Sequence, residues 1–164
     1  MRTRIIAAVV SSLVLAGSVL VGLGGSPVDS RPAHRTPTFA FGVVHLDGGQ
    51  EVPPADPDGR GTFAYIAVHD RICYVLTARR IEPATLAHIH AAPRGVNGGI
   101  VVMLIAPTKG FSADCIQAQP DTTPNTMEVL TQSELAAIIA DPTQFYANVH
   151  NDPFPGGAIR GQLR

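Results

Sequence analysis

Proline and glycine divide the chain into short apolar runs, and this spacing limits what it can fold into. The 164 residues include 14 prolines and 16 glycines, most of them between the apolar runs. Turns therefore follow one another too closely for long helices. At 45 % hydrophobic residues, the chain can form one core but lacks the length for two. We predict one all-β domain, an antiparallel Greek-key-like sandwich or small barrel of about seven strands.

The expected elements follow from local periodicity. Strands are predicted in the alternating run at residues 39–43, in a hairpin at 62–78, and at 87–90, 100–105, 145–150 and 158–163. A capping box from Thr131 to Glu134 predicts one short helix at about residues 132–140, which Pro142 ends. Residues 109–125 show no clear period and are predicted to be a loop.

The N-terminus has the layout of an export signal. Arg2 and Arg4 precede an apolar segment at residues 5–23, which small residues follow. We predict a signal peptide at 1–25, a flexible proline-containing linker at 26–37 and the folded domain at 38–164. Because the apolar segment is long for a signal, an uncleaved membrane anchor remains the alternative. A secreted or cell-envelope location follows in either case.

Charge argues against nucleic acid as a partner. Since Arg2 and Arg4 are the only charged residues of the export segment, the rest of the chain carries 13 acidic and 10 basic residues. These are scattered, whereas recognition of a phosphate backbone needs a concentrated basic patch.

Two cysteines, Cys73 and Cys115, follow the export segment. In an oxidising compartment the default prediction is a disulfide between them. Two buried free thiols are the alternative, because sequence does not show how far apart the residues lie.

Histidines occupy the polar faces of two predicted strands. Side chains alternate between the faces of a strand, so His88 and His90 share one face, about 6.6 Å apart along it. In the same way, Tyr146, Asn148 and His150 share a face, as do Arg160 and Gln162. His88, His90 and His150 are therefore candidate ligands of one ion, copper or zinc, with nitrogens within about 5 Å of each other. The alternative is a solvated polar face without a ligand.

Other chemistries find little support. There is no G-x-S-x-G nucleophile motif and no glycine loop of a phosphate-binding kind. We assign no catalytic residue, and the chain is more readily interpreted as a binding module than as an enzyme.

Three segments resemble, in the same order, the signature blocks of the chordin-type CHRD domain family. They are "LDGGQEVPP" from Leu46, "AHIHAAPRGVNGGIVVML" from Ala87 and "YANVHNDPFPGGAIRGQL" from Tyr146. The resemblance implies an all-β, stand-alone exported bacterial member of the family. It marks as signature polar positions the three histidines with Glu51, Asn148, Arg160 and Gln162. This chain has Ala158 where the family usually has glutamate, which removes a carboxylate from beside His150.

Two hypotheses follow. The chain is a non-enzymatic extracellular or cell-envelope module that binds an unidentified partner or has a structural role, or it is a copper- or zinc-binding protein that uses His88, His90 and His150. An H-x-H strand followed by a glycine-rich loop also looks like the copper site of superoxide dismutases. However, the chain lacks an evident second set of zinc ligands, so dismutase-like redox chemistry is not expected.

Overall fold

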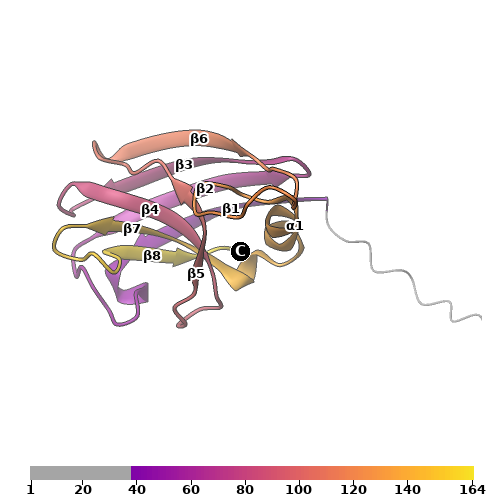
Figure 1. Cartoon of the computed structure of the whole chain (residues 1–164). Helices are drawn as coiled ribbons and strands as arrows, with labels where there is room; N and C mark the ends of the chain where they lie inside the picture. Colours follow the sequence, from indigo (N-terminus) through magenta and orange to yellow (C-terminus); the bar gives the residue numbers. More distant parts are fainter. Residues whose placement is uncertain (1–37) are drawn as a thin grey trace, which may run out of the picture. The chain divides into compact units, whose positions relative to one another are not determined.

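The computed structural model describes residues 38–164, which form an eight-stranded antiparallel sheet with one α-helix (Figure 1). The predicted signal peptide and linker lie outside the described residues. The strands are β1 (Phe39–Asp47), β2 (Arg60–Val68), β3 (Arg71–Arg79), β4 (Ala84–Ala91), β5 (Gly99–Leu104), β6 (Phe111–Gln117), β7 (Phe145–Asn151) and β8 (Ile159–Gln162). Short 3-10 turns lie at Gly48–Gln50 and Pro142–Gln144.

The sheet curls into a nearly closed, barrel-like structure. Its strand order is β5-β4-β7-β8-β1-β2-β3-β6, so the connections from β3 to β4, from β5 to β6 and from β6 to β7 join strands that are not neighbours. The two edges approach each other where the Ser112 hydroxyl donates to the Ile105 carbonyl, at 2.6 Å. This confirms the predicted mostly-β, antiparallel fold with one helix.

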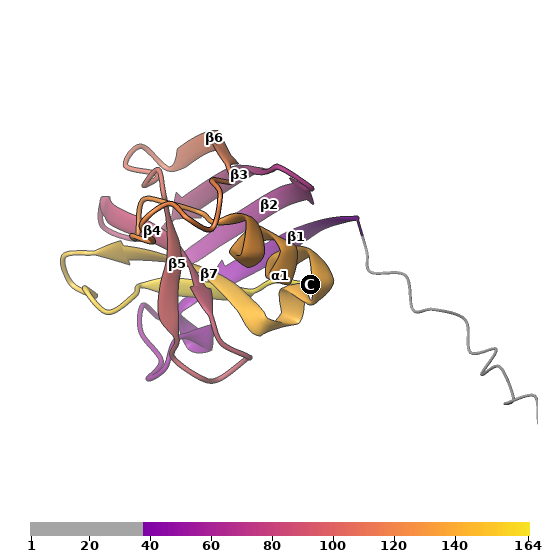
Figure 2. The ribbon, with the colours of Figure 1, turned by 45° about the vertical axis from the view of Figure 1, so that its right-hand side comes forward.

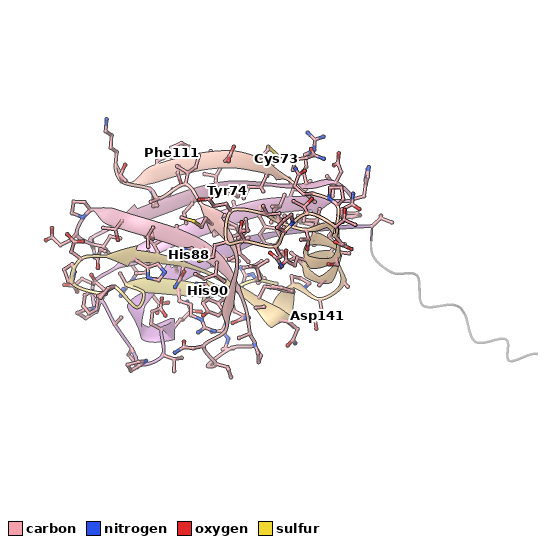
Figure 3. The ribbon with its side chains drawn as sticks, viewed as in Figure 1. Cys73, Tyr74, His88, His90, Phe111 and Asp141 are labelled. Atoms are coloured by element: carbon pink, nitrogen blue, oxygen red, sulfur yellow. A yellow bond between two sulfur atoms is a disulfide. The ribbon has the colours of Figure 1, made fainter. Side chains whose placement is uncertain are left out.

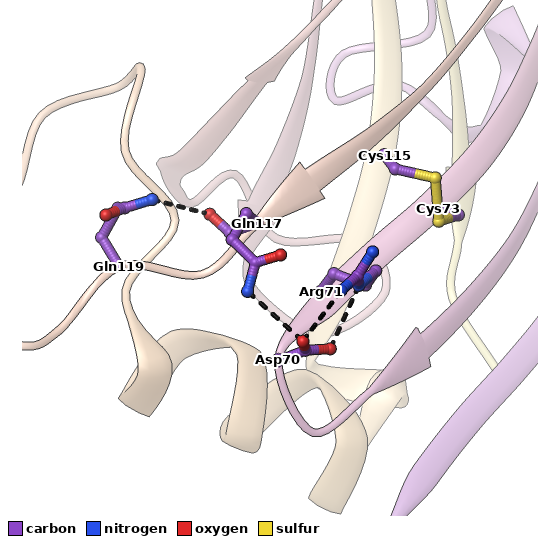
Figure 4. A network of polar contacts seen from close by, with 6 residues as sticks. All are labelled: Asp70, Arg71, Cys73, Cys115, Gln117 and Gln119. Atoms are coloured by element: carbon purple, nitrogen blue, oxygen red, sulfur yellow. Dashed lines mark hydrogen bonds and ion pairs between the residues drawn. A yellow bond between two sulfur atoms is a disulfide. The ribbon is translucent and has the colours of Figure 1, made fainter.

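One predicted loop is wrong. Residues 109–125 contain β6, which pairs with β3 along its whole length and makes the strand count eight, not seven. Cys73 and Cys115 face each other across this pair and form a disulfide. The bond joins the edge strand to the sheet (Figure 4).

The core lies inside the curled sheet. The inward side chains of neighbouring strands fill it, among them Phe63, Leu76, Ile89 and Ile159, all fully buried. Helix α1 (Gln132–Ala140) lies against β1 and β2 and contributes Leu135, Ile138 and Ile139 to buried packing (Figure 2). Its capping box forms as predicted. None of the helices in residues 38–164 has the length and apolar character that crossing a membrane would require.

Candidate metal centre

Two neighbouring strands bring the three predicted histidines together. His88 and His90 lie on β4 (Figure 3). The register pairs them with Asn148 and Tyr146 of β7, while His150 pairs with Leu86. Because facing residues of paired strands share a side of the sheet, all three imidazoles lie on the same face. One ligand nitrogen from each ring lies within 4.8 Å of the other two, as the alternation predicts.

This polar face is buried, whereas the alternative interpretation expected a solvated one. The exposed fractions of His88, His90 and His150 are 4 %, 7 % and 7 %, and that of Asn148 is 2 %. Loops at residues 47–58 and 92–98 cover the face, and the Asn97 amide of one loop donates to the Val52 carbonyl of the other at 2.7 Å. The face is therefore a closed interior site and not a wet sheet surface.

Buried side chains of β8 hold the second loop in place. Arg160 donates to the Val96 carbonyl at 2.9 Å, and Gln162 donates to the Ala92 carbonyl at 2.9 Å. The Arg160 guanidinium also lies 3.3 Å from the centre of the Tyr146 ring, and His90 stacks on Tyr146 at 4.7 Å. These contacts give structural roles to Tyr146 and to the signature residues Arg160 and Gln162, and they fix the orientation of the His90 ring.

Backbone carbonyls determine which nitrogen of two rings carries the proton. Nδ1 of His90 lies 3.1 Å from the Gly98 carbonyl, and Nδ1 of His150 lies 2.9 Å from the Pro155 carbonyl. Since a carbonyl only accepts, both Nδ1 atoms donate, and Nε2 of each neutral ring carries a lone pair. A backbone acceptor on the far nitrogen is the usual second-shell partner of a metal-binding histidine.

Four polar atoms of this site lie close together. Oδ1 of Asn148 lies 3.1 Å from Nε2 of both His90 and His150, and Nδ1 of His88 lies 3.0 Å from Nε2 of His150. Two ligands of one ion at bond lengths of about 2.1 Å are separated by about 3.0 to 3.4 Å. A cation here would take lone pairs from Asn148 Oδ1 and the ring nitrogens. Without one, Nδ1–H of His88 donates to Nε2 of His150, and a rotated Asn148 amide would present its NH₂ group to Nε2 of His90.

Burial keeps the rings neutral. It lowers the pKa of His88 to about 4, aided by the neighbouring His150 and His90. Burial likewise lowers the pKa of His90 and of His150, against opposing hydrogen bonds to Gly98 and Pro155 respectively. Neutral imidazole is the form that binds a metal ion, so no proton has to be displaced at neutral pH.

Glu51 lies beside the cluster, not within it. The carboxyl is buried, its Oε1 makes no hydrogen bond, and it lines a cleft together with Pro155 and Gly157. Burial raises the pKa of Glu51 to about 7, opposed by the charge of Arg160 and by a hydrogen bond with Asn148. Glu51 therefore places a carboxyl group, with one oxygen free of hydrogen bonds, at the edge of the site.

The CHRD domain family model matches residues 43–163. The chain belongs to the CHRD domain family. No curated protein and no solved structure matches this CHRD domain.

The signature positions of the CHRD domain thus gather at one place. His45 and His69 are exposed and lie outside the group; in the described residues the histidine group is the one set of His, Cys, Asp or Glu side chains suited to hold a metal ion. Sequence reasoning missed the backbone acceptors at Gly98 and Pro155. Each lies in a glycine- or proline-rich turn after a histidine, a pattern that marks close backbone approach.

Proposed function

We propose that this CHRD domain is a non-enzymatic extracellular or cell-envelope module that binds one copper or zinc ion through His88, His90 and His150. The observation that carries the proposal is the grouping of three buried imidazoles around one amide oxygen. Nε2 of His90 and Nε2 of His150 each lie 3.1 Å from Oδ1 of Asn148, and Nε2 of His150 also lies 3.0 Å from Nδ1 of His88.

The ligand set favours these two metals. Three imidazoles suit copper and zinc better than calcium or magnesium, and Cu(II) binds such sites more tightly than Zn(II). Asn148 Oδ1 supplies an oxygen as the fourth ligand, so the set does not need the carboxylate that Ala158 replaces. Because loops cover the site, we assign the ion a binding or structural role and no turnover.

Export supports the same proposal. The apolar segment at residues 5–23 has the features of a signal peptide, and a disulfide suits an oxidising compartment. We place the protein outside the cytoplasm, released or held in the envelope, with the mature chain beginning near Ser26.

The test is metal titration of the chain from Ser26 onward, made without a histidine tag and stripped with EDTA. All described elements lie beyond residue 38, so this chain keeps the whole fold. Calorimetric titration with Cu(II) and Zn(II) should give one equivalent bound. A His88→Ala, His90→Ala double variant should lose at least 100-fold in affinity, since two of three imidazoles are gone.

The matched control is the His45→Gln, His69→Gln double variant, which removes two exposed histidines and should bind like the wild type. The electron paramagnetic resonance spectrum of the Cu(II)-loaded wild type should show coupling to several nitrogens, a result that does not depend on how the variants fold. Sub-stoichiometric binding, or identical titrations of all three proteins, would refute the metal site and leave the buried histidines as a hydrogen-bonded structural network.

A further inference from the structure

The outer face of β1, β2, β3 and β6 is apolar although it is exposed. Phe41 is 69 % exposed, Phe111 60 % and Phe39 53 %, and Val43, Ile66 and Val75 are also exposed. We call this surface the apolar face; it comprises Phe39, Phe41, Val43, Ala64, Ile66, Cys73, Val75, Phe111, Ala113 and Cys115. Phe111 and Cys73 lie on it, on the β6 and β3 side of the sheet away from His88 and His90 (Figure 3).

The strand register arranges this face in rows. One row runs Phe41, Ile66, Cys73, Cys115 across the four strands, and the next runs Val43, Ala64, Val75, Ala113. Polar side chains flank the two apolar rows: Arg71 and Gln117 at one end, held by Asp70 (Figure 4), and His45, Thr62 and Thr77 at the other, in the row that ends at Phe111. An apolar centre with a polar rim is the usual anatomy of a protein interface.

We propose that the apolar face packs against the same face of a second copy of this chain, related by a two-fold axis that runs parallel to the strands between β2 and β3. With such an axis, each row of one copy lies opposite the same row of the other copy, and the order of the strands along the row is reversed. β1 then faces the partner's β6, and β2 faces the partner's β3.

Side-chain size supports this arrangement. In one row, Val43 then faces an alanine and Val75 faces an alanine; in the other, Phe41 and Ile66 each face a half-cystine. A large residue meets a small one at every position of both rows, which is how two packed layers interdigitate. A shallow hollow lined by Val43, Ala64 and Val75 lies at the centre, where Val75 of the second copy would insert.

The area is sufficient for a specific dimer. The three phenylalanines and three aliphatic side chains are each about half exposed, so together they offer roughly 600 Å² per copy. Pairing two copies would bury about 1,200 Å², the lower limit of specific interfaces. Two antiparallel sheets packed in this way would form a sandwich in which the sheets lie about 10 Å apart.

The test is sedimentation equilibrium of the chain from Ser26 onward, with two variants that place opposite charges at facing positions. The wild type should form a dimer with a dissociation constant in the micromolar range. Ala64→Glu and Val75→Lys each bury a charge against an apolar partner, so each should raise the dissociation constant at least about 30-fold. An equimolar mixture of the two variants should recover a dimer, because the two-fold axis sets the acid of one chain opposite the amine of the other.

Met127→Glu changes an exposed apolar residue outside the face and should leave the dimer intact. A wild type that stays monomeric at 200 μM would overturn the proposal. If that monomer also cosediments with phosphatidylglycerol vesicles, the apolar face would instead be a lipid-binding surface. A dimer unaffected by both variants, or a mixture that stays monomeric, would overturn the two-fold arrangement. The apolar face shares no residue with the candidate metal centre, so these outcomes do not depend on metal binding.

Discussion

A side chain at Gly157 would displace the carboxyl of Glu51 from its position beside the metal centre. The residue has φ +133°, and a Cβ there would overlap Oε1 of Glu51. We expect Gly157→Ala to lower the free energy of unfolding by about 2 kcal/mol, from backbone strain and displacement of the carboxyl. The neighbouring Gly156→Ala is the matched control, because a Cβ at Gly156 meets nothing within 4 Å.

Urea unfolding of the two variants measures this difference. Gly156→Ala should change the free energy of unfolding by less than about 1 kcal/mol. Equal stability of the two variants would show that Glu51 moves away at little cost and has no fixed position at the site.

The side on which each polar side chain lies could be predicted residue by residue, but its protonation could not. Alternation puts His88 and His90 on one face of their strand and His150 on the polar face of another, and the register then brings the two faces to one side of the sheet. The carbonyls of Gly98 and Pro155, which fix the tautomers, come from turns whose path no periodicity specifies. The chemistry of this site therefore depends on backbone geometry that the sequence pattern does not encode locally.

Among the elements, edge strand β6 was the one missed, for a physical reason. Of its seven residues only Ser112 is buried, so no hydrophobic alternation marks the strand. Pairing with β3 and the disulfide hold it in place instead. Strands with an apolar inner face, and the helix with its capping box, were predictable because their own residues carry the signal.

Loss of the disulfide should destabilise the domain measurably. The bond closes a loop with a sequence separation of 42 residues, which on the chain-entropy model contributes about 4 kcal/mol. Reduction should lower the free energy of unfolding by that order and speed amide hydrogen exchange in β6 before the other strands. Urea unfolding with and without reductant measures the first effect.

The control is the Cys73→Ala, Cys115→Ala variant, which should match the reduced protein and be insensitive to reductant. A stability that is the same in oxidised and reduced wild type would contradict a structural role for the bond.

At the scale of the whole molecule, burial of the polar face results from segments far apart in the chain. Loops at residues 47–58 and 92–98 meet over β4, β7 and β8 and are joined by Arg94 donating to Gln50 and Asn97 donating to Val52. A strand pattern alone cannot distinguish a covered polar face from a solvated one. Both were consistent with the sequence, and only the tertiary structure separates them.

The buried groups make the stability of the metal-free chain depend on pH in two opposed ways. The folded-state pKa values of all three histidines are lowered, that of His88 to about 4, so the unfolded chain binds more protons below pH 6.5 and stability falls on acidification. The pKa of Glu51 is raised to about 7, so the folded chain binds more protons between pH 4.5 and 7, and this contribution is lost as pH rises through that window. The contribution of the three histidines to the pH dependence of stability is larger than the opposing contribution of Glu51.

We therefore expect the free energy of unfolding in EDTA to level off above about pH 7 and to be lower by at least about 1 kcal/mol at pH 5, after allowance for solvent screening. Glu51→Gln removes the opposing group, so the stability of this variant should fall more steeply than that of the wild type between pH 6.5 and 5. Urea unfolding across this range measures both.

Saturating Zn(II) should stabilise the wild type by about 2.7 kcal/mol at 100 times its dissociation constant, and less at pH 5, because protons compete for the imidazoles. A pH profile that is flat in EDTA and unchanged by zinc would mean that the three rings neither resist protonation nor bind an ion.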